Sequence, residues 1–257
     1  MIRASDVTKT YGLKRGPRTV VLDGVSVDLA PSQLISIVGA NGAGKSTLLA
    51  IVSRLIEADR GSVFVDELNV ATAPSAEVAR RLAVLRQDTS MTSRLTVREL
   101  VAFGRFPHSQ GRLTRECERA VDSAIDYFEL GDLQHRYLDQ ISGGQRQRAF
   151  VAMVLAQDAK YVLLDEPLNN LDMRHAARMM GHLRRLVDEL GKSVVLVIHD
   201  INFASAYSDR LIALRHGSVV AQGTPAEIMR PDTLEQIYEF PIPVETIDGV
   251  PYAIYYR

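Results

Sequence analysis

The distribution of apolar residues along the chain predicts a sheet whose central strands are buried on both faces. Leu34–Val38, Tyr161–Leu164 and Ser193–Ile198 are almost entirely apolar, which is typical of parallel strands covered on both sides. In Val25–Leu29, apolar and polar residues alternate, so we expect a half-exposed antiparallel strand there. The other predicted strands are Ile2–Thr8, Val20–Leu29, Leu82–Arg86, Arg210–Arg215, Ser218–Gln222 and a pair around Asp248-Gly249.

The middle of the chain has a different, helical pattern. From about Asp88 to Gln157 there are few strand signals. Thr96 and Glu99 have the spacing of a capping box, in which the Thr oxygen accepts an early backbone N–H and the Glu carboxylate reaches back. A second helix is predicted over Thr114–Phe128. We therefore expect one domain over 1–257, with an α/β core formed by 1–87 and 158–257 and a helical subdomain inserted at 88–157.

Composition narrows the class of protein. The chain has 257 residues, of which 46% are hydrophobic and 24% charged, so it can bury a substantial core. Its net charge of −1 argues mildly against binding nucleic acid, because such proteins usually carry a basic surplus. The single cysteine, Cys117, excludes an internal disulfide. Since no apolar stretch is long enough to span a bilayer, any work at a membrane requires a partner.

A glycine-rich loop follows the first buried strand and precedes a helix predicted over Lys45–Ile56. It matches the phosphate-loop pattern at every required position. Its glycines let backbone N–H groups point inward, and the helix N-terminus favours anions. We expect Lys45 to bind phosphates and Ser46 to bind Mg²⁺. The predicted ATP-binding residues of this loop are Gly39, Ala40, Asn41, Gly42, Ala43, Gly44, Lys45, Ser46 and Thr47.

Two carboxylates stand where the strand Tyr161–Leu164 ends. The C-terminal end of a buried parallel strand lies at the ligand crevice of an α/β sheet. Asp165 can therefore hold Mg²⁺, mainly through water, and Glu166 can orient or deprotonate the attacking water. A solvated acidic turn is the alternative, and the neighbouring phosphate loop favours the catalytic interpretation.

A second glycine turn precedes another helix. The N-terminal dipole of that helix also favours binding of phosphate. The residues of the turn are Ser142, Gly143, Gly144 and Gln145. One nucleotide needs only one such helix start, so a head-to-tail dimer is the simple explanation. Each ATP would then lie between the phosphate loop of one copy and the glycine turn of the other. A capped, tightly packed helix start with no ligand is the alternative.

These motifs together resemble those of the ATP-binding-cassette (ABC) ATPases over nearly the whole chain. The phosphate loop is similar to the family's Walker A motif, Leu163–Glu166 to its Walker B motif, and Ile141–Gln145 to its signature. The resemblance implies a P-loop NTPase core with an antiparallel β subdomain and an inserted helical subdomain. It also implies that Gln87 is the glutamine that touches Mg²⁺ and that His199 senses the γ-phosphate.

The same resemblance assigns two further positions and the cofactors. Tyr11 lies where the family stacks an aromatic ring on adenine, and Asn170–Asp172 matches the D-loop of the dimer interface. The cofactors implied are ATP and Mg²⁺. The partners implied are a second copy or a paralogous ATPase, a transmembrane permease and, indirectly, a substrate-binding protein.

Several strings resemble the branch of importers for iron–siderophore complexes, which also includes haem and vitamin B12 importers. They are Gly104–Pro107, Gly111–Thr114, Gln145–Ala149 and Asp165–Asp172. The resemblance implies a peripheral subunit at the cytoplasmic face of the inner membrane. A soluble cassette acting on nucleic acid or ribosomes, or a regulatory nucleotide-binding module, is the competing class. The coiled-coil insertion or second cassette usual in soluble members is absent from this sequence.

One surface is expected to receive the permease. The helical block Asp88–Phe106 directly follows Gln87, so phosphate-driven motion at Gln87 can rotate it as a hinge-linked unit. By resemblance, the surface near Met91–Arg105 should form the groove that receives a short cytoplasmic helix of the permease. Arg94 and Arg98 are the expected contacts. The apolar residues of the block can instead belong to the core of the helical subdomain; these are Leu95, Val97 and Leu100.

Overall fold

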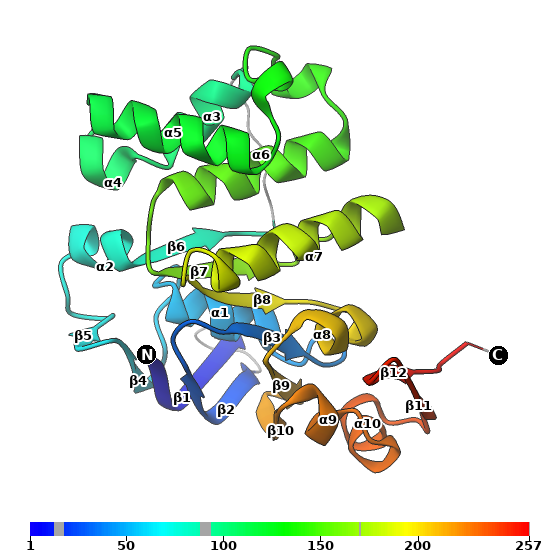
Figure 1. The fold of residues 1–257 in the computed structure, drawn as a ribbon. Coiled ribbons are helices and arrows are strands. Elements are labelled where there is room, and N and C mark those ends of the chain that lie inside the picture. Colours follow the sequence, from blue (N-terminus) through cyan, green and yellow to red (C-terminus); the bar gives the residue numbers. More distant parts are fainter. Residues whose placement is uncertain (13–17, 88–93, 170, 257) are drawn as a thin grey trace.

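The computed structural model describes residues 1–12, 18–87, 94–169 and 171–256. Asp88, Met91 and Asn170, which the sequence analysis singled out, lie outside the described residues. Figure 1 shows two sheets and a group of helices arranged in layers. The molecule is thus of mixed α/β class, as the apolar pattern predicts.

A six-stranded sheet with the order β10-β9-β3-β8-β7-β6 forms the centre of the molecule. Five of its strands are parallel, and β10 alone pairs antiparallel with its neighbour β9. The strands are β3 (Leu34–Val38), β6 (Leu82–Leu85), β7 (Tyr161–Asp165), β8 (Ser193–Val197), β9 (Arg210–Arg215) and β10 (Ser218–Gly223). The predicted buried strands are confirmed, with ends that differ by at most one residue.

An antiparallel sheet with the order β2-β1-β4-β5 packs against one side of this centre. It consists of β1 (Ile2–Gly12), β2 (Arg18–Leu29), β4 (Arg60–Val65) and β5 (Leu68–Asn69). A separate hairpin near the C-terminus joins β11 (Val244–Ile247) to β12 (Val250–Ala253). The predicted turn there is confirmed, because Asp248 and Gly249 both have positive φ, as a tight two-residue hairpin requires.

Neighbouring residues of β3 belong to two different hydrophobic cores. Leu34 and Val38 pack with helices, whereas Ile35 and Ile37 pack with the first helix and the antiparallel sheet. The strand is fully buried because both of its faces are covered. This explains why β3 reads as a continuous apolar run rather than an alternating one.

The helices cover both faces of the central sheet and extend beyond it. They are α1 (Lys45–Val52), α2 (Ser75–Arg81), α3 (Val97–Phe103), α4 (Phe106–Ser109), α5 (Arg115–Tyr127), α6 (Gly143–Ala156), α7 (Met173–Asp188), α8 (Ile201–Tyr207), α9 (Pro225–Ile228) and α10 (Pro231–Tyr238), with 3₁₀ turns at Gly131–Leu133 and Leu138–Gln140. Helix α1 ends four residues before the predicted Ile56. The helix stops there because Ser53 leaves the helical conformation and Arg54 has a φ of 59°.

Helices α3, α4, α5 and α6 gather on the side of the molecule away from the antiparallel sheet (Figure 1). The predicted caps are confirmed: Thr96 forms a capping box with Glu99 at the start of α3, and Thr114 caps α5. The end of α3 approaches α6 closely, since a Cβ on Gly104 would lie 2.0 Å from the carbonyl oxygen of Met153.

Candidate active site

The glycine loop joins the end of β3 to the start of α1, and its backbone is tightly packed. Gly39 has a φ of 137°, and a Cβ there would lie 2.1 Å from the carbonyl oxygen of Leu214. Gly44 has a φ of 100°, with a Cβ position 2.7 Å from the carbonyl oxygen of Val21. Only glycine fits both the conformation and the space at these two positions. Gly42 differs, because a Cβ there would meet no atom within 4 Å in the part of the chain that the structure describes.

The buried ammonium group of Lys45 lies over this loop. Its Nζ donates to the carbonyl oxygens of Gly39 at 2.8 Å and Ala40 at 2.9 Å. Burial lowers the pKa of Lys45, whereas the nearby carboxylates of Glu166 and Asp165 oppose that shift. The two carbonyls hold a positive charge at the loop, where an anion would replace them as its partner.

Ser46 and Asp165 meet between α1 and the end of β7. The Ser46 hydroxyl donates to Oδ1 of Asp165 at 2.8 Å. Burial raises the pKa of the Asp165 carboxyl, although the Ser46 hydrogen bond opposes that shift and Glu166 adds to it. A hydroxyl and a carboxylate in contact are oxygen ligands of the kind that Mg²⁺ accepts.

These oxygens do not form a complete metal cage. Among the residues that the structure describes, no group of three or more His, Cys, Asp or Glu side chains could hold a metal ion. Mg²⁺ commonly binds through one or two carboxylates together with phosphates and water, and does not need such a cage. The donor set therefore fits a magnesium ion that arrives with a nucleotide.

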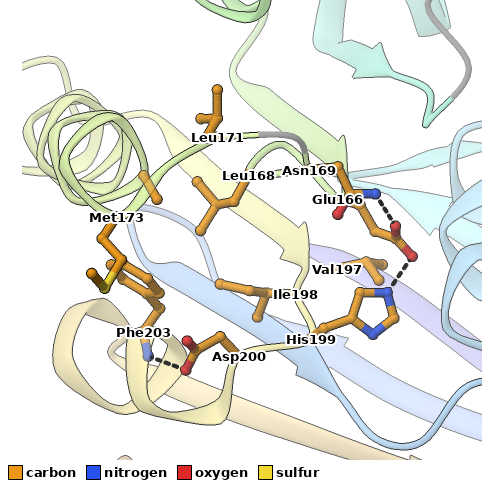
Figure 2. Close-up of a pocket in the computed structure, with 11 residues that line it drawn as sticks. Glu166, Leu168, Asn169, Leu171, Met173, Val197, Ile198, His199, Asp200 and Phe203 are labelled. Carbon is orange, nitrogen blue, oxygen red and sulfur yellow. Dashed lines mark hydrogen bonds and ion pairs between the residues drawn. The ribbon is translucent and has the colours of Figure 1, made fainter. Parts of the chain in front are cut away.

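The carboxylate of Glu166 accepts hydrogen bonds from three side chains. Its Oε1 accepts from Nε2 of His199 at 2.6 Å, and its Oε2 accepts from Nε2 of Gln87 at 2.7 Å. Asn169 also donates to Oε2 (Figure 2). The carboxylate is only 9% exposed, so these donors stabilise its charge where water largely cannot.

Three separate elements bring these groups together. Gln87 follows β6, Glu166 follows β7 and His199 follows β8. Because β6, β7 and β8 are parallel neighbours, their C-terminal ends meet at one edge of the sheet. Glu166 itself has a φ of 51°, and its backbone N–H donates to the carbonyl oxygen of Val197 at 3.1 Å.

A hollow of about 160 Å³ lies over the phosphate loop and is also lined by Glu166 and His199. Its lining residues are Val21, Asn41, Gly42, Ala43, Gly44, Lys45, Ser46, Thr47, Glu166 and His199. A larger pocket of about 260 Å³ shares Glu166 and His199 with this hollow and is otherwise lined mostly by apolar side chains (Figure 2). The hollow fits phosphate groups, because Gly42 leaves open space where a side chain would otherwise project and the Lys45 ammonium lies at its edge.

Two groups of predicted residues lie elsewhere. Tyr11 lies near the end of β1, with 45% of its surface exposed. The Nζ of Lys9 lies 5.7 Å from the centroid of the Tyr11 ring. The signature turn forms the start of α6, where Ser142 and Gln145 make a capping box. Among the described residues, neither Tyr11 nor the signature lines the hollow. Their contact with nucleotide stays a prediction.

The signature turn packs against the start of α7 within the same chain. A Cβ on Gly144 would lie 3.3 Å from the His175 ring. That ring contacts Asp172, which caps α7. Gly143 differs from Gly144, because a Cβ there would meet no atom of the described residues within 4 Å. The side of the turn at Gly143 is therefore free to receive a ligand.

The sequence analysis missed three residues of this site. Val21 lines the hollow from β2, Asn169 donates to Glu166, and His175 supports the signature turn. Asn169 could have been found, because an Asn three residues after the acidic strand end has the spacing of a turn. Val21 and His175 carry no signal in the sequence, since only the fold places them.

Known proteins match this chain in sequence and in fold. The ABC transporter family matches residues 22–169. The chain is 49% identical to the petrobactin import ATP-binding protein YclP of Bacillus subtilis, over 100% of both chains. It is 40% identical to the ferric enterobactin transport ATP-binding protein FepC of Escherichia coli, over 92% of this chain and 86% of FepC.

Among solved structures, the dimeric ATP-binding cassette MJ0796 with bound ADP and phosphate has a TM-score of 0.78 to this fold. It is 29% identical in sequence, over 88% of this chain and 99% of that one. The chain therefore belongs to the ABC transporter family. Within it, the chain is the nucleotide-binding ATPase domain. No helix in the described part of the chain is both long and apolar enough to cross a bilayer.

Proposed function

We propose that this chain is the motor subunit of an importer for iron(III)–siderophore complexes, driven by ATP hydrolysis. The assignment of the cargo is supported by the 49% identity, over the full length of both chains, to a petrobactin import protein. The cargo itself does not touch a motor subunit, so this assignment rests on kinship. The site geometry supports the motor activity independently of the cargo.

The phosphate loop supplies the binding groups for ATP. The backbone N–H groups of Gly39–Thr47 and the Lys45 ammonium bind the phosphate oxygens. Lys45 exchanges its two loop carbonyls for the β- and γ-phosphates. Tyr11 stacks on the adenine. Ser46, Asp165 and Gln87 would hold Mg²⁺, which would supply positive charge to the phosphates.

Glu166 acts as the general base towards water. Its carboxylate lies at the edge of the hollow, between Gln87 and His199. It orients the water and accepts its proton as the water attacks the γ-phosphate. His199 contacts Oε1 of Glu166 and also lines the hollow, so one imidazole can sense both the base and the phosphate.

A second copy of the chain, or a paralogous ATPase, completes each site. The signature residues lie away from the hollow of their own chain, so they are available to a nucleotide on a partner. The free side of the turn at Gly143 would then meet the γ-phosphate held by the partner's loop. The similar cassette MJ0796 is dimeric.

The transmembrane permease binds the helical subdomain. This subdomain comprises residues 88–157 and is inserted into the α/β core formed by 1–87 and 158–257. Phe103 and Phe106 are 52% and 61% exposed on α3 and α4, and exposed aromatic side chains of this size are typical of an interface. Arg94 is 63% exposed and pairs with Asp139 at 3.4 Å. Arg98 is less suitable than the sequence indicates, because it pairs with Asp122 at 2.6 Å and is 34% exposed.

The permease holds the chain at the cytoplasmic face of the inner membrane, and a substrate-binding protein delivers cargo from the other side. Nucleic acid has no part in this function. Import of haem or vitamin B12 is the alternative within the branch, and one relative is a hemin import ATP-binding protein. A soluble ABC ATPase without a permease is the alternative outside it.

The test is complementation in cells that lack their own siderophore-import ATPase and express this chain with its neighbouring permease genes. Radiolabelled ferric siderophore, haem and vitamin B12 are offered separately. We expect the wild type to restore ferric siderophore uptake and Glu166→Gln to restore none, while still binding ATP. Restored uptake of haem or vitamin B12 alone would contradict the assignment of ferric siderophore as the cargo. The assignment of the chain as a motor subunit would be unaffected. Failure of the chain to sediment with membranes containing the permease would favour the soluble class.

A further inference from the structure

We infer that Asn169 is a positioning residue for the general base Glu166, an inference that rests on the proposed function. The two residues are joined twice. The Asn169 backbone N–H donates to the Glu166 carbonyl oxygen at 3.2 Å, and the Asn169 side-chain amide donates to Oε2 of the Glu166 carboxylate. The first bond closes a turn, and the second orients the reacting group.

The turn needs this support because Glu166 has an unfavourable backbone conformation. Its φ of 51° lies in the left-handed region, which non-glycine residues adopt only when the surroundings hold them there. Pro167 follows and restricts the next φ to about −65°. The turn therefore fixes where the Glu166 side chain leaves the backbone, and the Asn169 amide fixes where its carboxylate points.

Asn169 differs from the other two donors in where it is attached. Gln87 and His199 come from the ends of β6 and β8, and in the proposed function both also face magnesium or phosphate. Their hydrogen bonds to Glu166 compete with those ligands. Asn169 belongs to the same turn as Glu166, so its bond can persist while the other two are exchanged.

The hydrogen bonds are distributed over the two carboxylate oxygens of Glu166 in a way that suits catalysis. Asn169 and Gln87 donate to Oε2, whereas His199 donates to Oε1. With Oε2 held by Asn169, rotation of the carboxylate is limited and Oε1 remains directed at the hollow. Asn169 touches neither nucleotide nor water in this scheme, so its effect on hydrolysis passes through Glu166.

Two substitutions separate this role from closure of the turn. Asn169→Asp has nearly the same shape and is compatible with turns, but its carboxylate cannot donate and repels Glu166. Asn169→Ala removes the side chain without adding charge. Asn202→Ala is the matched control, because the Asn202 side chain bonds only the backbone of Ala253 among the contacts described for it, at 3.1 and 2.7 Å.

The assay is steady-state ATP hydrolysis by the full chain, with its permease where that is required for turnover. We expect both Asn169 variants to lower kcat by about 10- to 100-fold, the effect of losing one hydrogen bond to a charged group. KM for ATP should stay within about twofold of the wild type, because the bond acts on the base and not on binding. Asn202→Ala should lower the melting temperature and leave kcat within about twofold.

A pH series gives the second readout. The kcat of Asn169→Asp relative to wild type should rise as the pH falls, because a protonated carboxyl group can donate again. Asn169→Ala should show no such recovery. The charged groups that face this position are Glu166 and His199, with Lys45 and Asp165 next to Glu166. The recovery is judged against Asn169→Ala at each pH, because that variant keeps these groups and lacks the added carboxylate.

The inference is wrong if both Asn169 variants keep a kcat within about twofold of wild type, or if their kcat falls only in step with stability, as in an unstable Asn202→Ala protein. A different result would count against the proposed function. Near-normal hydrolysis by Glu166→Gln would show that Glu166 is not the base, whatever the Asn169 variants do.

Discussion

Replacing Gly39 or Gly42 of the phosphate loop by alanine should impair two different properties of the protein. At Gly39 the new Cβ would lie 2.1 Å from the carbonyl oxygen of Leu214, far below the 3.0 Å that real contacts observe, and it would have a φ of 137°. At Gly42 the φ of 77° is also unfavourable, but the new Cβ meets no atom within 4 Å among the described residues. One variant is expected to lose stability, and the other to lose ATP binding.

The magnitudes follow from these contacts. For Gly39→Ala, backbone strain contributes about 1–3 kcal/mol and overpacking against fixed backbone about 1–3 kcal/mol more. The free energy of unfolding should therefore fall by roughly 2–6 kcal/mol, a large share of the ~5–15 kcal/mol typical of a domain. For Gly42→Ala, only the strain of about 1–2 kcal/mol applies.

Calorimetry and nucleotide binding measure the two effects. The melting temperature should fall by about 2–4 °C for each kcal/mol in a protein of this size, so Gly39→Ala should melt at least twice as far below wild type as Gly42→Ala. Gly42→Ala should fold and yet bind a fluorescent ATP analogue weakly, because its methyl group enters the hollow of about 160 Å³. Equal melting temperatures for Gly39→Ala and wild type would refute the packing argument. Normal ATP affinity of Gly42→Ala would refute the location of the phosphates.

Three further predictions concern other parts of the chain. Lys45→Ala should fold normally and lose at least about 100-fold in hydrolysis rate, as expected for losing a charge that acts on the transferred phosphate; near-normal turnover of purified protein would contradict the loop assignment. Burial, with Arg185 next in importance, lowers the pKa of His182 from 6.5 to about 4. The unfolded chain therefore binds a proton that the folded chain rejects, so stability should fall by up to about 3 kcal/mol as pH drops from 6.5 to 4. His182→Asn should lack that part of the pH dependence in chemical denaturation, and an unchanged profile would contradict it. Gly104→Ala should lower stability by about 1–3 kcal/mol through contact with α6, whereas Gly181→Ala, in open space on α7, should raise it by about 0.5–1 kcal/mol; thermal melts that rank the two the other way would exclude this explanation.

Much of the fold follows from local patterns in the sequence. The strand Leu34–Val38 is confirmed at both ends, because a short and almost entirely apolar run bounded by polar residues and glycine has few other solutions. The capping box at Thr96 and the hairpin turn at Asp248-Gly249 are also confirmed, since each depends only on residues close in the chain.

Elements that depend on distant partners were not predicted. Arg60–Val65 forms β4 by pairing with β1, and its irregular apolar pattern gives no sign of that pairing. Helix α2 is short, and Val78 is its only buried residue among those described, so its sequence has no amphipathic repeat to read.

The candidate site divides in the same way. The loop at Gly39–Thr47 and the carboxylates after β7 were found from spacing alone, because phosphate binding requires backbone geometry that only certain residues allow. The internal ion pair of Arg98 with Asp122 was not foreseen, since it joins two helices whose packing the sequence does not specify. Exposure of a charged residue on a helix cannot be predicted without that packing.

The alternation of β3 between two cores has a consequence for how this family can change. Leu34 and Ile35 are neighbours in the chain, yet one contacts the helices and the other contacts α1 and the antiparallel sheet. Substitutions at these two positions should therefore be constrained by different sets of partners. Across homologous sequences, we expect position 34 to covary with residues of the helical side and position 35 with residues of the antiparallel sheet. Adjacent columns of an alignment would then reflect substitutions in two different hydrophobic cores.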